Sequence, residues 1–549
     1  MTLSPRYRPA LLAAMVALLL YAITLRGTFI EDDVIAIRED PRLYEPGQWH
    51  DLLTGPYWFG GSVDNIYRPL VSLSYALQWR LIGDKPPQDT VTSSTKPSVH
   101  LLPDSHALPF HAVNWILNAI VAAMVAELAR RLAASESGNA PAYIAGLLFA
   151  VHPIHVEAVA GLVGRAEMMC AIGVLGAIIL LLHRPLTILR VFSIVGCLAF
   201  AIFSKEQGML LPLLMLLLPL SLGVKPPKSE RERQTVLWLV FLACACTAGY
   251  IIFREAKLPF EWDTYFLDFS EQPMVRCSRV GRLLMPFVLL GHYAQLLIFP
   301  LHLSPDYGGA IIGWVVHFND PYLYAGIAVV IAYLAVLAAL VLRGSPLSRP
   351  MRAVLFCLLA AGALYGMVGN IVSLIGTNFG ERLMYLPSAF LMIAAGIVLT
   401  RLPRSFCILI TAVAIVLGSI RTFTYAREWN DRLSFYELTS AAQPKSVRLH
   451  MLVAIESLSQ GKMDQAKEAD RAGRESLPDY PEVWIQSAQI ALAAGEFDQA
   501  EAFLKRAMDI QPSLKVTHWL ARVADARSAA KSQTPKTASA PATFPAPTQ

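Results

Sequence analysis

Long runs of apolar residues recur along the chain and indicate its fold class. They include Leu11–Leu25, Ala142–Val163, Val236–Phe253, Tyr322–Leu342 and Ala353–Ile375. Each is close to the roughly 20 residues that an α-helix needs to cross the hydrocarbon of a bilayer. Their apolar residues cover both sides of the helix, unlike the single apolar face of a helix that lies on a soluble core. The pattern predicts an all-α, polytopic membrane protein.

The polar breaks between the runs carry clusters of Lys and Arg, which mark the cytoplasmic side when they lie in short loops. The clusters are Arg6/Arg8, Arg130/Arg131, His183–Arg190, Lys225–Arg233, Arg343–Arg352 and Arg401–Arg404. Placing all of them inside predicts about eleven crossings, a cytoplasmic N-terminus and a C-terminus on the outer side. The predicted crossings are 10–25, 111–132, 142–160, 168–182, 189–203, 207–222, 235–253, 322–342, 353–375, 383–400 and 405–423.

One further run, Leu283–Pro300, would put Arg343–Arg352 outside if it crossed the membrane. We therefore expect it to lie on the outer face or dip into it, with Pro286 and Pro300 breaking its helix. At the start of the chain, the first run follows two arginines and lacks a small-x-small cleavage site before the next polar segment. These features favour a retained first helix over a cleaved signal peptide.

Composition agrees with the membrane prediction. Of the 549 residues, 55% are hydrophobic and only 16% are charged, whereas about a quarter of the residues in a soluble domain are charged. The formal net charge of +5 is modest and is informative about membrane topology rather than about nucleic-acid binding. We therefore predict no nucleic-acid partner. Most of the cysteines lie in or beside apolar runs, so we expect neither a disulfide framework nor a CxxC metal site.

After Arg427 the sequence becomes that of a soluble helical domain with a repeat of about 34 residues, the length of a tetratricopeptide repeat. The repeat is visible in the pairs Gly461/Gly495, Asp464/Asp498, Gln465/Gln499, Ala466/Ala500 and Pro478/Pro512. We predict a membrane domain over 1–427 with a long first outer loop over 26–109, a repeat domain over 428–527 and a disordered tail over 528–549. The repeats suit either a packing cap or a peptide-binding concave face.

The acidic cluster Glu31-Asp32-Asp33 directly follows the first crossing. A carboxylate at the lip of a membrane cavity can act as a general base, because partial desolvation raises its pKa toward the working pH. The alternative is that the three acids merely solvate the end of a helix. Arg68 lies in the same outer loop, where its guanidinium could grip a phosphate with two hydrogen bonds or extend along the membrane surface.

The next predicted outer turn holds His152, His155 and Glu157, followed by Arg165 and Glu167. Two histidines and a carboxylate could bind a divalent metal ion, but their spacing is not HExxH. We favour a hydrogen-bonded scaffold in this turn, and we predict no cofactor other than such a candidate metal ion.

Two later turns pair a basic residue with an acidic neighbour, namely Lys205 with Glu206 and Arg382 with Glu381. Each couple is either a self-neutralising ion pair or a contact for a phosphate. Charged residues are costly near the hydrocarbon, so the gathering of these charges on one predicted face of the protein is itself a site hypothesis.

Several segments, in this order, resemble the transmembrane and tetratricopeptide repeat-containing O-mannosyltransferases and their bacterial relatives. The matching segments are EDD (31–33), YRPL (67–70), FHAVN (110–114), FAVHPIHVEAVAGLVGRAE (149–167), SKEQG (204–208), LSPDY (303–307) and ERLMYLPS (381–388), followed by the repeats. The likeness covers most of 26–440. It is weak over 255–285, and 86–106 looks like an insertion.

This resemblance implies a GT-C glycosyltransferase that moves mannose or a similar hexose, with inversion, from a polyprenyl-phosphate lipid to Ser/Thr hydroxyls of outer-side proteins. It implies that Asp32 and Asp33 are the catalytic pair, one of them the base. The candidates for binding the donor phosphate are Arg68, Arg165, Lys205 and Arg382. The supporting residues are His152, His155, Glu157, Glu167, Glu206 and Glu381.

The expected location is a bacterial inner membrane with the repeats in the periplasm, where they could bind the acceptor protein. Two other functions stay open, namely transfer of the sugar to a glycolipid or envelope polysaccharide, and a non-catalytic scaffold built on the repeats. A transporter is disfavoured because the charges gather at one face and do not line the midplane.

Overall fold

The computed structural model describes residues 4–45, 47–59, 66–82, 106–133, 138–183, 185–223, 229–258, 272–307, 312–342 and 346–533. The regular elements of these residues are all helices. Contacts divide the chain into a membrane unit, 1–87 with 102–446, and a repeat unit, 88–101 with 447–549. The all-α prediction is confirmed.

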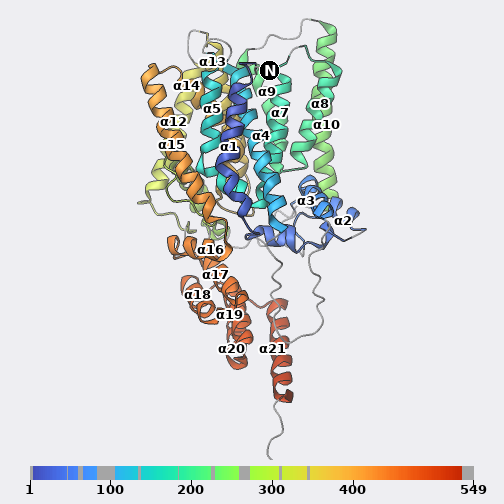
Figure 1. Ribbon diagram of the computed structural model, residues 1–549, viewed down its shortest axis with the longest axis vertical. Coiled ribbons are helices and arrows are strands. Elements are labelled where there is room, and N and C mark those ends of the chain that lie inside the picture. The colour runs from blue at the N-terminus through green and yellow to red at the C-terminus, as the bar shows by residue number, and fades with distance from the viewer. Residues whose placement is uncertain are drawn as a thin grey trace, which may run out of the picture. The chain divides into compact units, whose positions relative to one another are not determined.

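Within the described residues, nine helices are long and apolar enough to cross a membrane, and Figure 1 shows the long helices of the membrane unit running alongside one another. The nine are α1 with η1 (Arg8–Tyr21, Ala22–Arg26), α4 (Ala107–Ala133), η7 with α7 (Leu162–Gly164, Arg165–Leu181), α10 (Glu230–Lys257), α11 (Arg279–Ile298), α12 (Pro321–Val341), α13 (Arg349–Val368), η11 with α14 (Glu381–Met384, Tyr385–Leu399) and α15 (Arg404–Glu428).

The other three predicted crossings coincide with broken or shorter helices. The first, 142–160, is a pair bent by 55°, formed by α5 (Ala140–Val151) and the segment Pro153–Ala160, which comprises η6 (Pro153–His155) and α6 (Val156–Ala160). The bend falls at Pro153, whose nitrogen has no hydrogen to continue the helix of α5. The others are α8 (Ile188–Ile202) and α9 (Leu211–Leu222), the latter preceded by the 3-10 helix η8 (Glu206–Leu210).

The helix α11 differs from its prediction in one respect. It continues through Pro286 and ends at Ile298, before Pro300. The expected break at Pro286 is therefore wrong, because the loss of one backbone hydrogen bond is tolerated inside this helix.

Contacts on both sides of α11 tie it to the same end of the bundle. Before α11, Gln272 Nε2 donates to Asn370 Oδ1 at 2.9 Å, and Asn370 lies in the segment that leads into η11. At the end of α11, His152 Nε2 lies 3.0 Å from the Leu297 carbonyl oxygen. The chain between Gln272 and the start of α11 can reach at most about 25 Å. That is less than the hydrocarbon thickness of about 30 Å, so this stretch cannot by itself cross from one face of the membrane to the other. The length and composition of α11 allow a crossing, so its position on the outer face stays a prediction.

Two helices lie at the centre of the bundle. The spans that contain α7 and α14 are the most buried of the nine, whereas the spans of α12 and α15 are mostly exposed to the surroundings of the protein. Small residues allow the inner helices to approach closely: a Cβ added at Gly396 on α14 would lie 2.7 Å from the Pro141 carbonyl oxygen of α5. The central helices α7 and α14 begin at the turns that hold most of the candidate charges.

The first loop folds into short elements around an aromatic core. It contains the π-helix η2 (Val34–Arg38), the 3-10 helix η3 (Pro41–Leu43), α2 (Trp49–Thr54) and α3 (Pro69–Ile82). The ring of Trp79 lies 5.1 Å from that of Phe110 and 6.5 Å from that of Phe29, and its Nε1 donates to the Ile37 carbonyl at 3.0 Å. This core fixes the loop against the start of α4.

The repeat unit contains the helix pairs α17 (Val447–Ser459) with α18 (Met463–Ser476) and α19 (Pro481–Ala493) with α20 (Phe497–Ile510), followed by α21 (Leu514–Gln533). Gly461 and Gly495 occupy equivalent turns with φ of 73° and 77°, a conformation that glycine adopts without strain. The repeat of about 34 residues that the sequence predicts is thus present as two helix pairs and a further helix.

Both predicted boundaries of the repeat domain shift in the structure. The helix α16 (Arg432–Ala442) belongs to the membrane unit, and the division falls after Ser446. At the other end, α21 continues to Gln533 into the segment expected to be disordered. Residues 534–549 of that segment lie outside the described residues.

Candidate active site

The acids that follow the first crossing form a tight turn with two different carboxylates. Asp33 is fully buried, and its carboxylate accepts hydrogen bonds from the backbone N–H of Val163 at 2.9 Å and of Ile30 at 3.3 Å. Burial raises the pKa of Asp33 to about 7, although these N–H donors act in the opposite direction. Asp33 therefore joins the first loop to the turn ahead of α7.

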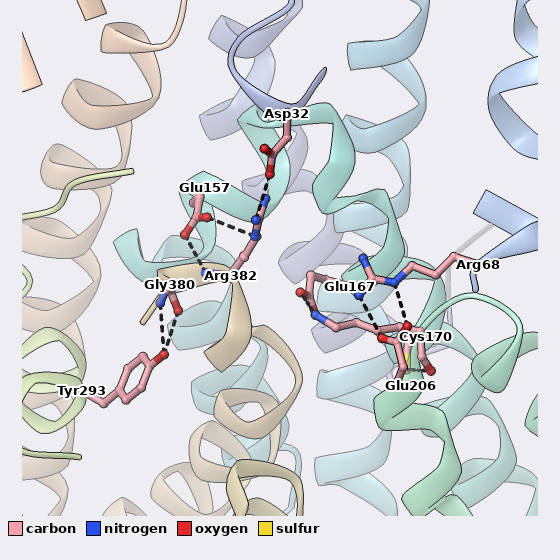
Figure 2. A network of polar contacts seen from close by, with 10 residues as sticks. Asp32, Arg68, Glu157, Glu167, Cys170, Glu206, Tyr293, Gly380 and Arg382 are labelled. Atoms are coloured by element: carbon pink, nitrogen blue, oxygen red, sulfur yellow. Dashed lines mark hydrogen bonds and ion pairs between the residues drawn. The ribbon is translucent and has the colours of Figure 1, made fainter. Parts of the chain in front are cut away.

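Asp32 faces the other way, toward the turn that precedes α14. Its Oδ2 accepts from Arg382 Nη2 at 3.0 Å, and the side chains of Asp32 and Arg382 are 21% and 29% exposed. Figure 2 shows Arg382 lying between the carboxylates of Asp32 and Glu157. Glu157 accepts from the Arg382 backbone N–H at 2.8 Å and pairs with its Nε at 3.3 Å. Three turns that are distant in sequence thus meet at one guanidinium.

Buried hydrogen bonds hold the Arg382 turn in place. The hydroxyl of Tyr293 donates to the Gly380 carbonyl at 3.0 Å and accepts from the Gly380 N–H at 3.3 Å. The buried Glu381 carboxylate accepts from the Tyr307 hydroxyl at 2.7 Å and from the Ser304 N–H at 2.8 Å. Glu381 is therefore bound to the 303–307 segment and does not pair with its neighbour Arg382.

A second group of charges lies between the first loop and the turn after α8. Arg68 donates from Nη2 and Nε to the two carboxylate oxygens of Glu206, at 2.9 Å and 3.3 Å. Burial lowers the pKa of Arg68, but the charge of Glu206 and its hydrogen bonds, with smaller contributions from Tyr57 and Glu167, together raise the pKa above the usual value. Lys205 is bound to Glu167, and burial lowers the pKa of Lys205 against the opposing charge of Glu167.

Tyr57 lies near both groups of charges. Burial raises the pKa of its hydroxyl to about 12, and the charges of Arg68, Asp32 and Asp33 also act on it. The Arg68 guanidinium lies over the Tyr57 ring at 5.4 Å from the centroid. The acid turn and the Arg68 cluster are therefore neighbours, and Figure 2 shows them in one view of the site.

Arg165 has a different environment from the other candidate cations. It is fully buried, lies 4.4 Å over the Tyr75 ring, and donates to Asn114 Oδ1 and the Phe110 carbonyl, each at 3.0 Å. Further donors of its guanidinium bind Ser74 and Gln78. These contacts give Arg165 the role of joining α3, α4 and α7, and they leave a phosphate little access to it.

The two histidines are bound to the framework of the protein. His152 lies against the Leu297 carbonyl and accepts from the Ile154 N–H, while His155 lies 2.9 Å from the Phe149 carbonyl oxygen and 2.7 Å from Ser388 Oγ. Among the described residues, no group of three His, Cys, Asp or Glu side chains is arranged to hold a metal ion. These contacts are those of the hydrogen-bonded scaffold that the sequence analysis favoured.

Sequence reasoning did not single out three tyrosines around the site. Tyr57 and Tyr293 lie in segments whose pattern resembles ordinary loop or apolar sequence, and no local signal distinguishes them. Tyr307 ends the LSPDY segment, so the motif contained the residue but not its role as a partner of Glu381.

Comparison with known proteins finds similarities for both parts of the chain. A tetratricopeptide repeat model matches residues 457–518. A protein O-mannosyl-transferase of Caenorhabditis elegans is 23% identical over 462 residues, which cover 81% of this chain and 59% of that protein. The human protein O-mannosyl-transferase TMTC1 is 35% identical over 176 residues, or 31% of this chain and 17% of the relative. No solved structure matches the chain.

A third relative, the mouse protein O-mannosyl-transferase TMTC3, is 26% identical over 392 residues, which cover 66% of this chain and 39% of that protein. The chain spans about three fifths of the nematode protein and less than half of the two mammalian ones. The resemblance that the motifs indicated is confirmed: this chain is a relative of the transmembrane and tetratricopeptide repeat-containing O-mannosyltransferases.

Proposed function

We propose that the chain is an integral-membrane glycosyltransferase that moves mannose from a polyprenyl-phosphate lipid to Ser/Thr hydroxyls of proteins on the outer side of the membrane. The observation that carries the proposal is the contact of Asp32 with Arg382. It brings together a partly exposed carboxylate and a partly exposed cation from turns that are far apart in the sequence. A reaction that expels a phosphate and deprotonates a hydroxyl needs one group of each kind.

In the proposed step, the acceptor hydroxyl attacks the anomeric carbon of the sugar from the side opposite the phosphate. The carbon–oxygen bond to the phosphate breaks as the new glycosidic bond forms, so the configuration inverts. The hydroxyl proton goes to a carboxylate, and polyprenyl phosphate leaves with the bonding electrons. A polyprenyl chain stays in the bilayer, so this chemistry takes place at the membrane surface. Nearby carboxylates would also stabilise an oxocarbenium-like transition state.

Geometry favours Asp32 over Asp33 as the base. Asp32 is partly exposed at the Arg382 contact, whereas the Asp33 carboxylate is buried and occupied by two backbone N–H groups. The pKa of Asp33, at about 7, would suit a base, but a base must first reach the proton that it removes. We assign Asp33 the task of holding the turn.

Arg68, Lys205 and Arg382 are the cations proposed for the departing phosphate. Each is paired with a carboxylate in the resting protein, so a phosphate would compete with Glu206, Glu167 or Asp32. Arg68 and Arg382 are partly exposed, whereas Lys205 is buried with Glu167. We therefore place the two arginines nearest to the donor.

The proposal is tested with the full-length chain purified into lipid nanodiscs and supplied with a panel of polyprenyl-phosphate sugars. We expect polyprenyl phosphate to be released from the mannose donor, and labelled sugar to appear on protein. Label in lipid or polysaccharide extracts instead would establish the alternative acceptor. Absence of release from every donor, with the protein folded, would favour the scaffold.

A further inference from the structure

The turn that presents Asp32 contains a backbone conformation that side-chain-bearing residues rarely adopt. Glu31 has φ of +49°, in the left-handed region that favours glycine. The turn's own hydrogen bonds are Asp33 N–H to the Ile30 carbonyl and Val34 N–H to the Glu31 carbonyl, each at 3.1 Å. A strained turn of this kind persists only when contacts from outside it hold it in place.

One such contact comes from a helix more than 400 residues away. The backbone N–H of Glu31 donates to the hydroxyl of Tyr436 at 3.0 Å, across a sequence separation of 405 residues. Tyr436 is buried and lies on α16, which follows the last long helix of the membrane unit. The strained residue next to Asp32 is thus hydrogen-bonded to a fixed side chain.

The helix α16 is itself anchored beside the same site. The Phe435 ring lies 4.4 Å from that of Trp429, and a Cβ at Gly161 would lie 3.5 Å from the Trp429 ring. Gly161 belongs to the turn whose Val163 N–H binds Asp33. Beyond α16, the Ser446 hydroxyl donates to the Asp306 carboxylate. Contacts of the α16 segment therefore reach both the acid turn and the 303–307 segment that binds Glu381.

We infer that Tyr436 is a positioning residue, whose hydroxyl fixes the Glu31 peptide and thereby directs the Asp32 carboxylate toward Arg382. The mechanistic part of this inference rests on the proposed glycosyltransferase function, whereas the holding of the turn does not. Only residues 443–446 separate α16 from α17, the first helix of the repeat unit. The helix that contacts the acid turn is therefore close in sequence to the repeat unit.

The test compares Tyr436→Phe with Tyr425→Phe in the full-length protein. Both tyrosines are buried, but the Tyr425 hydroxyl has no hydrogen-bond partner among the described residues, so this control removes a hydroxyl without a known bond. We expect amide hydrogen exchange in the 30–34 turn to rise in Tyr436→Phe only. We also expect turnover to fall by roughly tenfold or more, because small displacements of a reacting group are costly, while the KM for the donor stays within about twofold.

Unchanged exchange of the turn in Tyr436→Phe would overturn the inference, whatever the activity. So would an equal loss of turnover in the two variants, or a loss that lies wholly in the KM for the donor. A third outcome separates the two claims. If exchange of the turn rises in Tyr436→Phe but even the wild-type protein releases no lipid phosphate, the proposed function is contradicted, whereas the hydrogen bond from the turn to Tyr436 is supported.

Discussion

Asp32 and Asp33 are adjacent in sequence, yet their carboxylates have opposite surroundings. The side chain of Asp33 points into the protein and is satisfied by backbone N–H groups, whereas that of Asp32 meets Arg382 where both are partly exposed. Adjacent residues in a turn point in different directions, so one acidic pair can supply both a reacting group and a structural one. This division of roles can be tested one residue at a time.

Replacing Asp32 by Asn should leave the protein folded and lower turnover by about a hundredfold or more, because loss of a general base typically costs a factor of 10² to 10⁴. Asp51→Asn is the matched control, since its carboxylate is exposed and its ion pair among the described residues is with His50 in the same loop. The measurement is the release of lipid phosphate from saturating donor. Retention of full turnover by Asp32→Asn would remove Asp32 from the reaction.

The raised pKa of Asp33 predicts a pH dependence of stability. A pKa of about 7 in the folded state, against an ordinary value of 3.8, means that the folded protein binds the proton more tightly than the unfolded chain. This contribution is fully present below about pH 4 and is lost as the pH rises through about 7.

The unfolding temperature of the wild type should therefore fall as the pH rises from 5 to 8. Asp33→Asn, which cannot ionise, should show a flatter profile over the same range. Parallel profiles for the two proteins would contradict the assignment of the buried proton to Asp33.

At the scale of elements, backbone contacts between helices decide the geometry of the site face. The helices α11 and α12 meet at two glycines: a Cβ at Gly291 would lie 2.1 Å from the Tyr322 carbonyl oxygen, and one at Gly326 would lie 1.8 Å from that of Phe287. The same stretch of α11 supplies Tyr293, which holds Gly380. Close packing of these helices therefore supports the Arg382 turn.

Gly326→Ala should destabilise the membrane unit by about 1–3 kcal/mol, the usual cost of forcing extra atoms into a packed contact. Gly249→Ala on α10 is the control, because a Cβ there meets no atom within 4 Å and alanine favours the helix. The two variants should move the midpoint of thermal unfolding in opposite directions. Equal midpoints would show that α11 and α12 do not pack through Gly326.

At the scale of the whole molecule, the proposed function requires the site face to lie on the outer side of the membrane. A single cysteine introduced at Ser513, in the turn between α20 and α21, should react with an impermeant maleimide in intact cells. A cysteine at Ser229, at the start of α10, should react only after the cells are opened. The background should be the protein with its seven native cysteines, all free, replaced by serine or alanine. The reverse labelling pattern would contradict the predicted orientation.

Apolar patterning in the sequence was sufficient for the fold class, because a run of about 20 apolar residues has few options other than a helix in lipid. The expected crossings at 111–132 and 322–342 coincide with α4 and α12, and the Gly461/Gly495 spacing predicted the repeats. The continuity of α11 through Pro286 was not predictable, since the cost of one lost hydrogen bond depends on its neighbours.

The amino-acid pattern alone predicts an all-helical membrane protein with repeats, and the motifs place the candidate charges in a few turns. Which of these charges come into contact depends on the folded structure. It paired Asp32 with Arg382 and Glu157, placed Arg165 among buried partners, and brought Tyr436 to the acid turn. Hydrophobic periodicity is a local property of the chain, whereas ion pairs and buried hydrogen bonds depend on how distant turns come together at the ends of packed helices.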